Sequence, residues 1–209
     1  MKMADREKGG RLEELLEAGK KNGYVLYDDM DALLPADYES GPELDDVLAA
    51  VQRAGIEVVI RTDGDVVDEP EIVEEMGADI YTDDPVGVYV HEVGRLPRLT
   101  RAAEIELAKV VGLADASAAR AKKDLVEANL MQVVVIARQY ANRGVHILEL
   151  IQEGNNGLMK AAESFDYIRG YRFSVYAGWL ARRFIIRAAR QSGGKAIVPP
   201  HLKPPFWIQ

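Results

Sequence analysis

The chain has 209 residues and is 48% hydrophobic, which predicts one or two domains with a sizeable apolar core. It contains no cysteine, so a disulfide framework and a thiolate metal site are excluded. The first 21 residues include no long apolar run, so we expect neither a signal peptide nor a membrane anchor. A soluble cytoplasmic protein is the default expectation.

The net charge of −8 is divided unequally along the chain. Residues 1–84 carry 24 acidic and 8 basic side chains, whereas residues 85–209 carry 10 acidic and 18 basic ones, which gives the two parts charges of −16 and +8. Two interpretations remain open. The acidic part is a solvated tail beside an ordinary helical domain, or it imitates a polyanion and shields the basic part.

The acidic part predicts a small helical module. Residues 11–35 contain two runs of helical pattern separated by a glycine turn, and the run "ELDDVLAAVQRAGIEVVI" predicts another helix that stops at Gly55. The segment that follows is acidic and weakly periodic, which is typical of a linker. We therefore place a helical module at residues 1–62 and an acidic linker at residues 63–83.

The basic part predicts helices almost throughout, and the fold class is therefore all-α. Thr100, followed by Glu104, is a plausible helix start, and Gly144 is a stop. A further helical run covers residues 146–165 and contains the unusual centre Gly-Asn-Asn-Gly. We place one helical core domain at residues 84–198 and a proline-rich, non-helical tail at residues 199–209.

The stretch from Tyr167 to Gln191 has six arginines, several aromatic rings and no acidic residue. It predicts a helix from about Val175, capped by Ser174, whose solvent face combines aromatic and cationic side chains. Aromatic rings stack on unpaired bases, worth about 1–3 kcal/mol each, and arginines neutralise phosphates. The alternative is that the rings belong to the core and the arginines pair with the acidic half of the same chain. The predicted solvent face consists of Tyr176, Trp179, Arg183, Arg187 and Arg190.

Residues 84–201 resemble a primary bacterial sigma factor, the subunit through which RNA polymerase finds and opens promoters. The resemblance is carried by "DPVGVYVHEVGRLPRLTRAAEIELAK", "EANLMQVVVIARQYANRG" and, above all, "ILELIQEGNNGLMKAAESFDYIRGYRFSVYAGWLARRFIIRAAR". The N-terminal runs "LLEAGKKNGYVLYDDMDALLP" and "LDDVLAAVQRAGIEVV" resemble the acidic autoinhibitory module of the same family. The resemblance implies a non-enzymatic function in transcription initiation and transcription regulation. Its partners would be core RNA polymerase and promoter DNA, especially the single-stranded non-template minus-ten element.

The resemblance also implies two sets of site residues. One set would dock on the clamp helices of the largest catalytic subunit of the polymerase, and glycines in the same helix would let that partner approach closely. The other set would bind, flip and hold minus-ten DNA. The polymerase-binding set is Leu148, Glu149, Gln152, Glu153, Asn155 and Met159. The DNA-binding set is Glu104, Asn129, Phe165, Tyr167, Arg169, Tyr171, Arg172, Phe173, Tyr176, Trp179, Arg182, Arg183, Arg187 and Arg190.

The chain departs from the family pattern mainly at positions that would read DNA. Leu180 stands for the second tryptophan of the wedge, Arg183 for a base-reading glutamine, and Ile186 and Gly178 for threonines. The docking positions match better, and after about His201 the resemblance ends. We therefore predict a divergent sigma factor that is truncated after its second conserved region. The alternatives are a decoy that occupies the sigma site without opening promoters, and a non-functional remnant.

Enzymatic interpretations have little support in the sequence. The three histidines are far apart and lack the spacing of metal ligands, and "SGGKAI" lacks two residues that a phosphate-binding loop needs. We therefore expect no catalytic residue, no metal and no cofactor.

Overall fold

The computed structural model describes residues 3–31, 33–34, 42–62, 65–67, 85–113, 116–141 and 144–191. The predicted proline-rich tail and most of the predicted linker lie outside these residues. The helices are α1 (Met3–Asn22), α2 (Tyr27–Asp31), α3 (Pro42–Arg53), α5 (Pro85–Gly94), α6 (Arg101–Val111), α7 (Ala116–Glu127), α8 (Leu130–Tyr140), α9 (Ile147–Ser164) and α10 (Phe173–Gln191). A short 3-10 helix covers Tyr167–Arg169, and the strands are β1 (Tyr24–Leu26), β2 (Glu57–Thr62) and β3 (Asp65–Val67).

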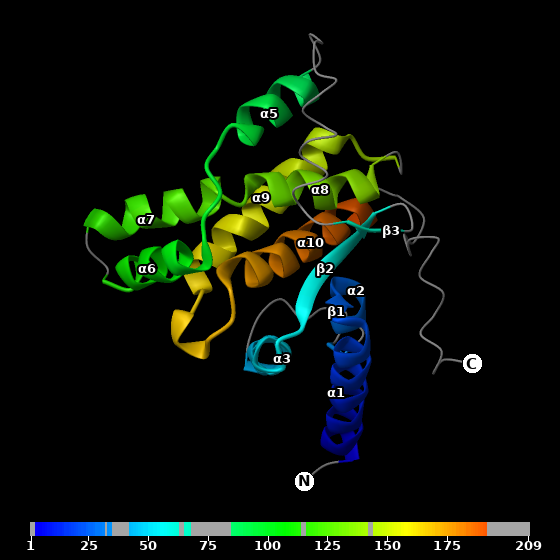
Figure 1. Cartoon of the computed structure of the whole chain (residues 1–209). Coiled ribbons are helices and arrows are strands. Elements are labelled where there is room, and N and C mark those ends of the chain that lie inside the picture. The colour runs from blue at the N-terminus through cyan, green and yellow to red at the C-terminus, as the bar shows by residue number, and fades with distance from the viewer. Residues whose placement is uncertain are drawn as a thin grey trace.

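The predominantly helical class is confirmed, and the structure adds a small sheet to the N-terminal part (Figure 1). The strand order is β1-β2-β3, with β1 and β2 parallel and β2 and β3 antiparallel. The predicted stop at Gly55 is confirmed, because α3 ends at Arg53 and Gly55 has a φ of 69°. The run "EVVIRT" that follows forms β2, since its β-branched residues favour an extended backbone.

The helix boundaries in the basic part follow the sequence closely. Thr100 caps α6 by accepting a hydrogen bond from the backbone nitrogen of Ala103 at 3.3 Å. Gly144, with a φ of 93°, follows the end of α8. The prediction of a cap at Ser174 is wrong, because α10 already begins at Phe173. In the described residues, no helix combines the length and the apolar character that crossing a membrane requires.

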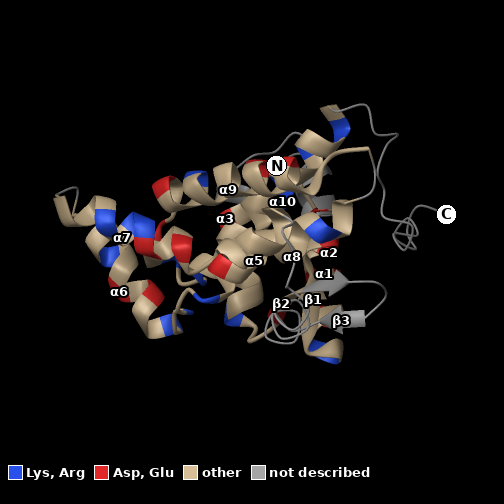
Figure 2. Cartoon of the chain, turned by 90° about the horizontal axis from the view of Figure 1, so that it is seen from above, with Lys and Arg blue, Asp and Glu red and all other residues tan. Residues whose placement is uncertain are grey.

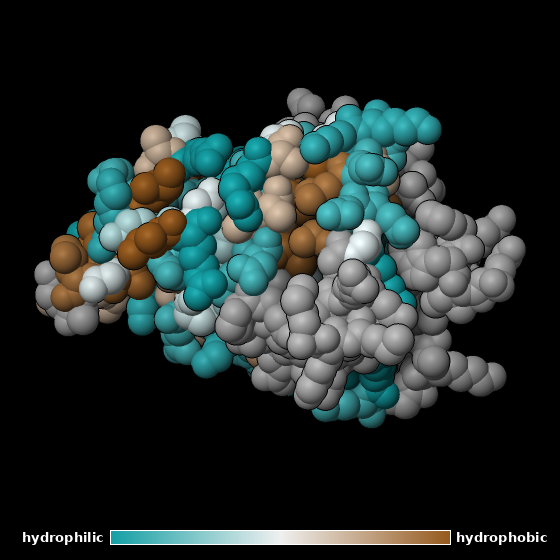
Figure 3. All heavy atoms as spheres, turned by 90° about the horizontal axis from the view of Figure 1, so that it is seen from below, coloured by the Kyte–Doolittle hydropathy of each residue, from teal (hydrophilic) through white to brown (hydrophobic). Residues whose placement is uncertain are grey.

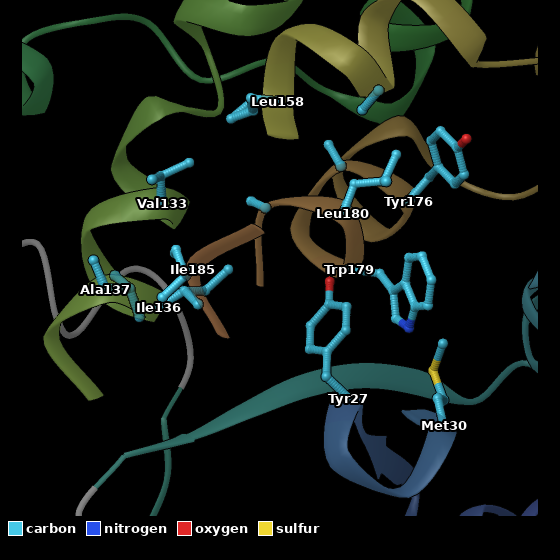
Figure 4. Close-up of a cluster of buried hydrophobic side chains, with 14 of the residues drawn as sticks. Tyr27, Met30, Val133, Ile136, Ala137, Leu158, Tyr176, Trp179, Leu180 and Ile185 are labelled. Carbon is cyan, nitrogen blue, oxygen red and sulfur yellow. The ribbon is translucent and has the colours of Figure 1, made fainter. Parts of the chain in front are cut away.

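The core of the basic part is built around α10 (Figure 1). Helices α8 and α9 pack on one side of it, where Val133, Leu158 and Ile185 are completely buried. The acidic module packs on the other side, and Figure 4 shows Tyr27 and Met30 of α2 pointing toward Trp179. Module and core thus share one continuous hydrophobic cluster.

Two glycines of α9 explain why that helix lies so close to its neighbours. A side chain at Gly157 would come within 2.8 Å of the Cα of Ala181 in α10, and one at Gly154 within 2.4 Å of Val133 in α8. Both glycines are buried. The expectation that they open α9 to an external partner is therefore wrong, because they face the core of this chain.

Candidate functional site

The aromatic side chains of the predicted solvent face of α10 are buried in this structure. Tyr176 is 3% exposed and Trp179 is completely buried, so the expectation of an open aromatic face is wrong for this conformation. The periodicity placed this face on the solvent side of α10, although the hydroxyl of Tyr176 shares a hydrogen bond with Ser164 at the end of α9. It could not show that an acidic module of the same chain covers it. Of the predicted cationic residues, Arg187 and Arg190 remain exposed and Arg183 is half-buried.

Arg182 is the charged centre of the contact between module and core. Its guanidinium makes ion pairs with the carboxylates of both Asp28 and Asp31 of α2. The residue is only 5% exposed. Burial, followed by the nearby charge of Arg183, lowers the pKa of Arg182 to about 9, so the side chain is still protonated at neutral pH.

Arg183 supports the same contact from the next position. Its guanidinium lies 3.9 Å from Asp31 and its central carbon lies 5.2 Å from the centre of the Trp179 ring, a cation–π distance. One acidic helix turn therefore engages two arginines that the sequence assigned to DNA. Carboxylates occupy the places where phosphates would be expected.

A second acidic contact lies at the segment before α10. Asp45 of α3 accepts a hydrogen bond from the hydroxyl of Tyr171 at 2.5 Å and pairs with Arg169 at 2.8 Å. Burial, with the hydrogen bond to Asp45 as the next cause, raises the pKa of Tyr171 well above its usual value. The alternative interpretation of the sequence, in which these arginines pair with the acidic half, therefore describes this conformation.

Four of the predicted DNA-binding rings form one cluster at the N-terminal end of α10. The ring of Phe165 lies 5.7 Å from Tyr171, 5.2 Å from Phe173 and 6.0 Å from Tyr176, measured between ring centres. The Tyr176 hydroxyl shares a hydrogen bond with Ser164 at 2.9 Å. The resemblance implied that these rings bind DNA, and in this structure they pack on one another. Tyr167 lies beside them in the 3-10 helix and is half-buried.

Glu104, Asn129 and Arg172 line one cavity of about 610 Å³ between module and core. Glu104 is 3% exposed and pairs with Arg172 at 2.9 Å, which ties α6 to the segment before α10. Asn129 donates a hydrogen bond to the carbonyl oxygen of Leu125 at 2.8 Å. The resemblance implied that both Glu104 and Asn129 belong to the DNA-binding set. The structure brings them together, with α3 and β2 of the module forming the opposite wall.

The predicted polymerase-binding residues lie on α9. Glu149, Gln152 and Met159 are exposed, and the exposed fraction of Met159 is 50%. Leu148 and Glu153 are half-buried. In Figure 2 the ribbon of α9 carries both acidic and basic residues. None of the acidic-module elements covers this face in the described part of the chain, in contrast to α10.

Asn155 is directed differently from the rest of this set. Its amide nitrogen donates a hydrogen bond to the hydroxyl of Tyr89 in α5 at 3.0 Å. Burial raises the pKa of Tyr89, and this hydrogen bond opposes the rise. Asn155 therefore holds α5 against α9 in this structure.

The module's half of the contact was not predicted from the sequence; it consists of Tyr27, Asp28, Asp31 and Asp45. The run "YDDMD" contains the relevant pattern, since it places an aromatic ring and three carboxylates within five residues. Gly178, which lies next to the Tyr27 hydroxyl, was noted only as a departure from the family, and Gln132, which donates a hydrogen bond to Tyr27, was assigned no role. Within the described residues, no group of His, Cys, Asp and Glu could hold a metal ion.

Apolar side chains are also exposed at the end of the molecule where α6 lies. Ile105 is 38% and Leu113 is 66% exposed, and both belong to α6 or the turn after it. Figure 3 shows hydrophobic residues scattered among hydrophilic ones at this end of the molecule. The sequence did not single them out, because isolated exposed apolar residues are normal on protein surfaces.

Fold and site together define a two-part helical protein, in which an acidic module covers a cationic and aromatic helix. Comparison with protein families matches three consecutive regions of one family. Residues 7–85 match sigma-70 factor region 1.1, residues 84–111 match region 1.2, and residues 125–194 match sigma-70 region 2. The chain belongs to the sigma-70 family.

Several curated relatives match over most of this chain. It is 40% identical over 201 residues to RNA polymerase sigma factor SigA of Listeria monocytogenes, covering 91% of this chain and 53% of the relative. It is 38% identical over 198 residues to SigA of Clostridium acetobutylicum, covering 94% and 51%, respectively. A Bacillus SigA is 37% identical over 206 residues, and the match covers 91% of this chain and 54% of the relative. The chain thus spans about half the length of these relatives.

Proposed function

We propose that this chain acts as a sigma factor in transcription initiation, binding core RNA polymerase through α9 and minus-ten promoter DNA through α10. The observation that carries the proposal is the presence of three sigma-70 regions in their order over one chain. Relatives with 37–40% identity bear the name RNA polymerase sigma factor. The exposed face of α9 adds support, because Glu149, Gln152 and Met159 are accessible to a partner.

In this proposal α9 is the polymerase-binding element. A helix that lies on a helical hairpin needs an exposed apolar anchor and a few polar groups that fix its register. Met159 supplies the anchor, whereas Glu149 and Gln152 supply the polar groups on the same side. The clamp helices of the largest catalytic subunit are the proposed partner, with Leu148 and Glu153 at the margin of the contact.

The proposed DNA-binding element is α10 together with the segment before it. Tyr176 and Trp179 would stack on and wedge against bases, and Arg182 and Arg187 would contact the backbone of the opened strand. This binding requires the module to leave, because Trp179 is completely buried. We therefore propose that residues 1–62 shield the DNA-binding face until it is needed.

The covered face also favours a second candidate function, that of a decoy. A chain whose docking helix is accessible while its DNA-binding helix stays covered would occupy the sigma site without opening promoters. The two candidates make opposite predictions for one assay. Core polymerase with this chain starts transcripts from a double-stranded promoter template if the chain is an active sigma factor, and starts none if it is a decoy.

Docking itself is tested by co-elution with core polymerase in gel filtration. The double variant Gln152→Ala/Glu153→Lys should bind at least about tenfold more weakly than the parent chain, a difference of about 1.4 kcal/mol. The control is Glu13→Lys, which introduces a similar charge change on the exposed side of α1. If the double variant co-elutes as well as the control does, α9 is not the docking helix.

A further inference from the structure

Gly178 lies in the first half of α10, where Tyr27 of the acidic module comes close to the helix. A Cβ at this position would lie 2.6 Å from the hydroxyl oxygen of Tyr27 and 2.5 Å from the amide nitrogen of Gln132. Both distances are shorter than any relaxed contact of a Cβ atom allows. The absence of a side chain at Gly178 therefore leaves the space that the hydroxyl end of Tyr27 occupies.

Tyr27 is held in that space by polar contacts with the core. Its hydroxyl donates a hydrogen bond to the carbonyl oxygen of Val175 at 3.3 Å, and it accepts one from Gln132 at 3.4 Å. The residue is 3% exposed. A buried hydroxyl needs such partners, because an unsatisfied one is costly to desolvate. The contact thus joins α2, α8 and α10 at one point.

A glycine at this position is otherwise unfavourable. In a helix interior, glycine is less stable than alanine because it loses more backbone freedom on folding. Its use there is to permit close approach of another group. The group that approaches Gly178 most closely from the module is Tyr27, so the glycine stabilises docking at the expense of the isolated helix.

We propose that Gly178 is a socket for Tyr27, and that this socket makes α10 select the chain's own module over nucleic acid. The second half of the statement rests on the proposed DNA-binding function of α10. The first half depends only on the geometry around Gly178. A larger residue at position 178 would displace Tyr27 and, because the ring is rigid, the helix α2 that carries it.

The socket acts alongside the ion pairs of Arg182 but differs from them physically. Pairs between carboxylates and guanidinium groups weaken as salt screens them, most of all where they are partly exposed. A steric fit with neutral hydrogen bonds is far less sensitive to salt. Docking through the socket should therefore persist at salt concentrations at which the attraction between the −16 and +8 parts is screened.

The test is amide hydrogen exchange of the full chain, with no DNA and no polymerase. Gly178→Ala should exchange at least tenfold faster than the parent over Tyr24–Asp31, because the module leaves the socket. Helices α8 and α9 should exchange no faster, since alanine favours the helix they pack on. The matched control is Gly10→Ala in α1, where an added Cβ meets nothing within 4 Å. It should leave exchange over Tyr24–Asp31 unchanged.

A double variant separates the steric cause from a general folding defect. Tyr27→Phe removes the hydroxyl that the alanine methyl would meet, while the end of Gln132 can rotate away. Tyr27→Phe/Gly178→Ala should therefore exchange at least threefold more slowly over Tyr24–Asp31 than Gly178→Ala alone. If Gly178→Ala leaves this exchange unchanged, or if the double variant is no slower than the single one, the socket is refuted.

Binding to a single-stranded minus-ten oligonucleotide tests the selection of the module over nucleic acid. Gly178→Ala should bind it at least threefold more tightly than the parent. If exchange rises as expected but affinity does not, the socket stands and the proposed DNA-binding role of α10 fails. If neither changes, the socket itself is wrong. The two results thus distinguish the two claims.

Discussion

The buried arginine at the centre of the module contact allows a sharp prediction about shielding. Asp28→Asn/Asp31→Asn keeps the shape of both side chains but removes both charges that face Arg182. Arg182 is 5% exposed, so the closed form would then hold an unpaired buried cation. Removing the partner of a buried charge costs about 3–5 kcal/mol, which corresponds to about two to four orders of magnitude in the docking equilibrium.

The loss of docking free energy in this variant has an upper limit. Once the module undocks, water hydrates Arg182, so the variant can lose no more than the free energy of docking. Deletion of residues 1–80 removes the module altogether and defines that limit. We expect the double variant to bind a labelled single-stranded minus-ten oligonucleotide within about threefold of the deletion form. Fluorescence anisotropy at about 50 mM salt is the assay, because the screening length there still exceeds about 10 Å.

A charge-matched control separates direct pairing from diffuse attraction. Asp46→Asn/Glu57→Gln makes the same change in net charge at two exposed positions of the module. It should alter oligonucleotide affinity by less than about twofold, since exposed charges contribute little. If this control raises affinity as much as the Asp28/Asp31 variant does, the shielding comes from net charge and the reasoning from Arg182 is wrong. Equal affinity of parent and deletion form would refute shielding altogether.

Three further results are expected. The complex with core polymerase should prefer a fork-shaped minus-ten oligonucleotide over a scrambled one by less than about tenfold, as measured by competition titrations at two salt concentrations. The variant Tyr176→Ala should lose most of that preference. A hundredfold preference of the parent chain would contradict this prediction. Gly154→Ala should lower the free energy of unfolding by about 1–3 kcal/mol in urea titrations, because the new methyl group would overlap Val133 and Ile185. The raised pKa of Tyr171, caused by burial and by Asp45, means that its neutral form is stabilised in the fold. Its stability contribution is complete below about pH 10 and is lost as pH rises further, so urea midpoints at about pH 9 and pH 11 should differ more in the parent than in Tyr171→Phe.

Membership of the sigma-70 family and most of the helices could be predicted from the sequence, because both depend on local sequence patterns. Thr100 and Gly144 are where a helix cap and a helix stop were expected, since capping and positive φ depend on the residue itself and its nearest neighbours. The grouping of Phe165 with Tyr171 and Tyr176 was likewise predictable, because these rings lie within twelve residues of one another. The parallel pairing of β1 with β2 was not, because it joins strands on opposite sides of α2 and α3.

By itself, the sequence determined that α10 carries an aromatic and cationic face, whose residues recur at the helical period of 3.6. Only the tertiary structure decided what covers that face. Trp179 is buried because α2 lies on it, and Arg182 is paired because two aspartates about 150 positions earlier reach it. Periodicity distinguishes one side of a helix from the other, but water and an acidic module of the same chain satisfy the same polar side. The pairing is a long-range contact, and its geometry exists only once both parts are folded.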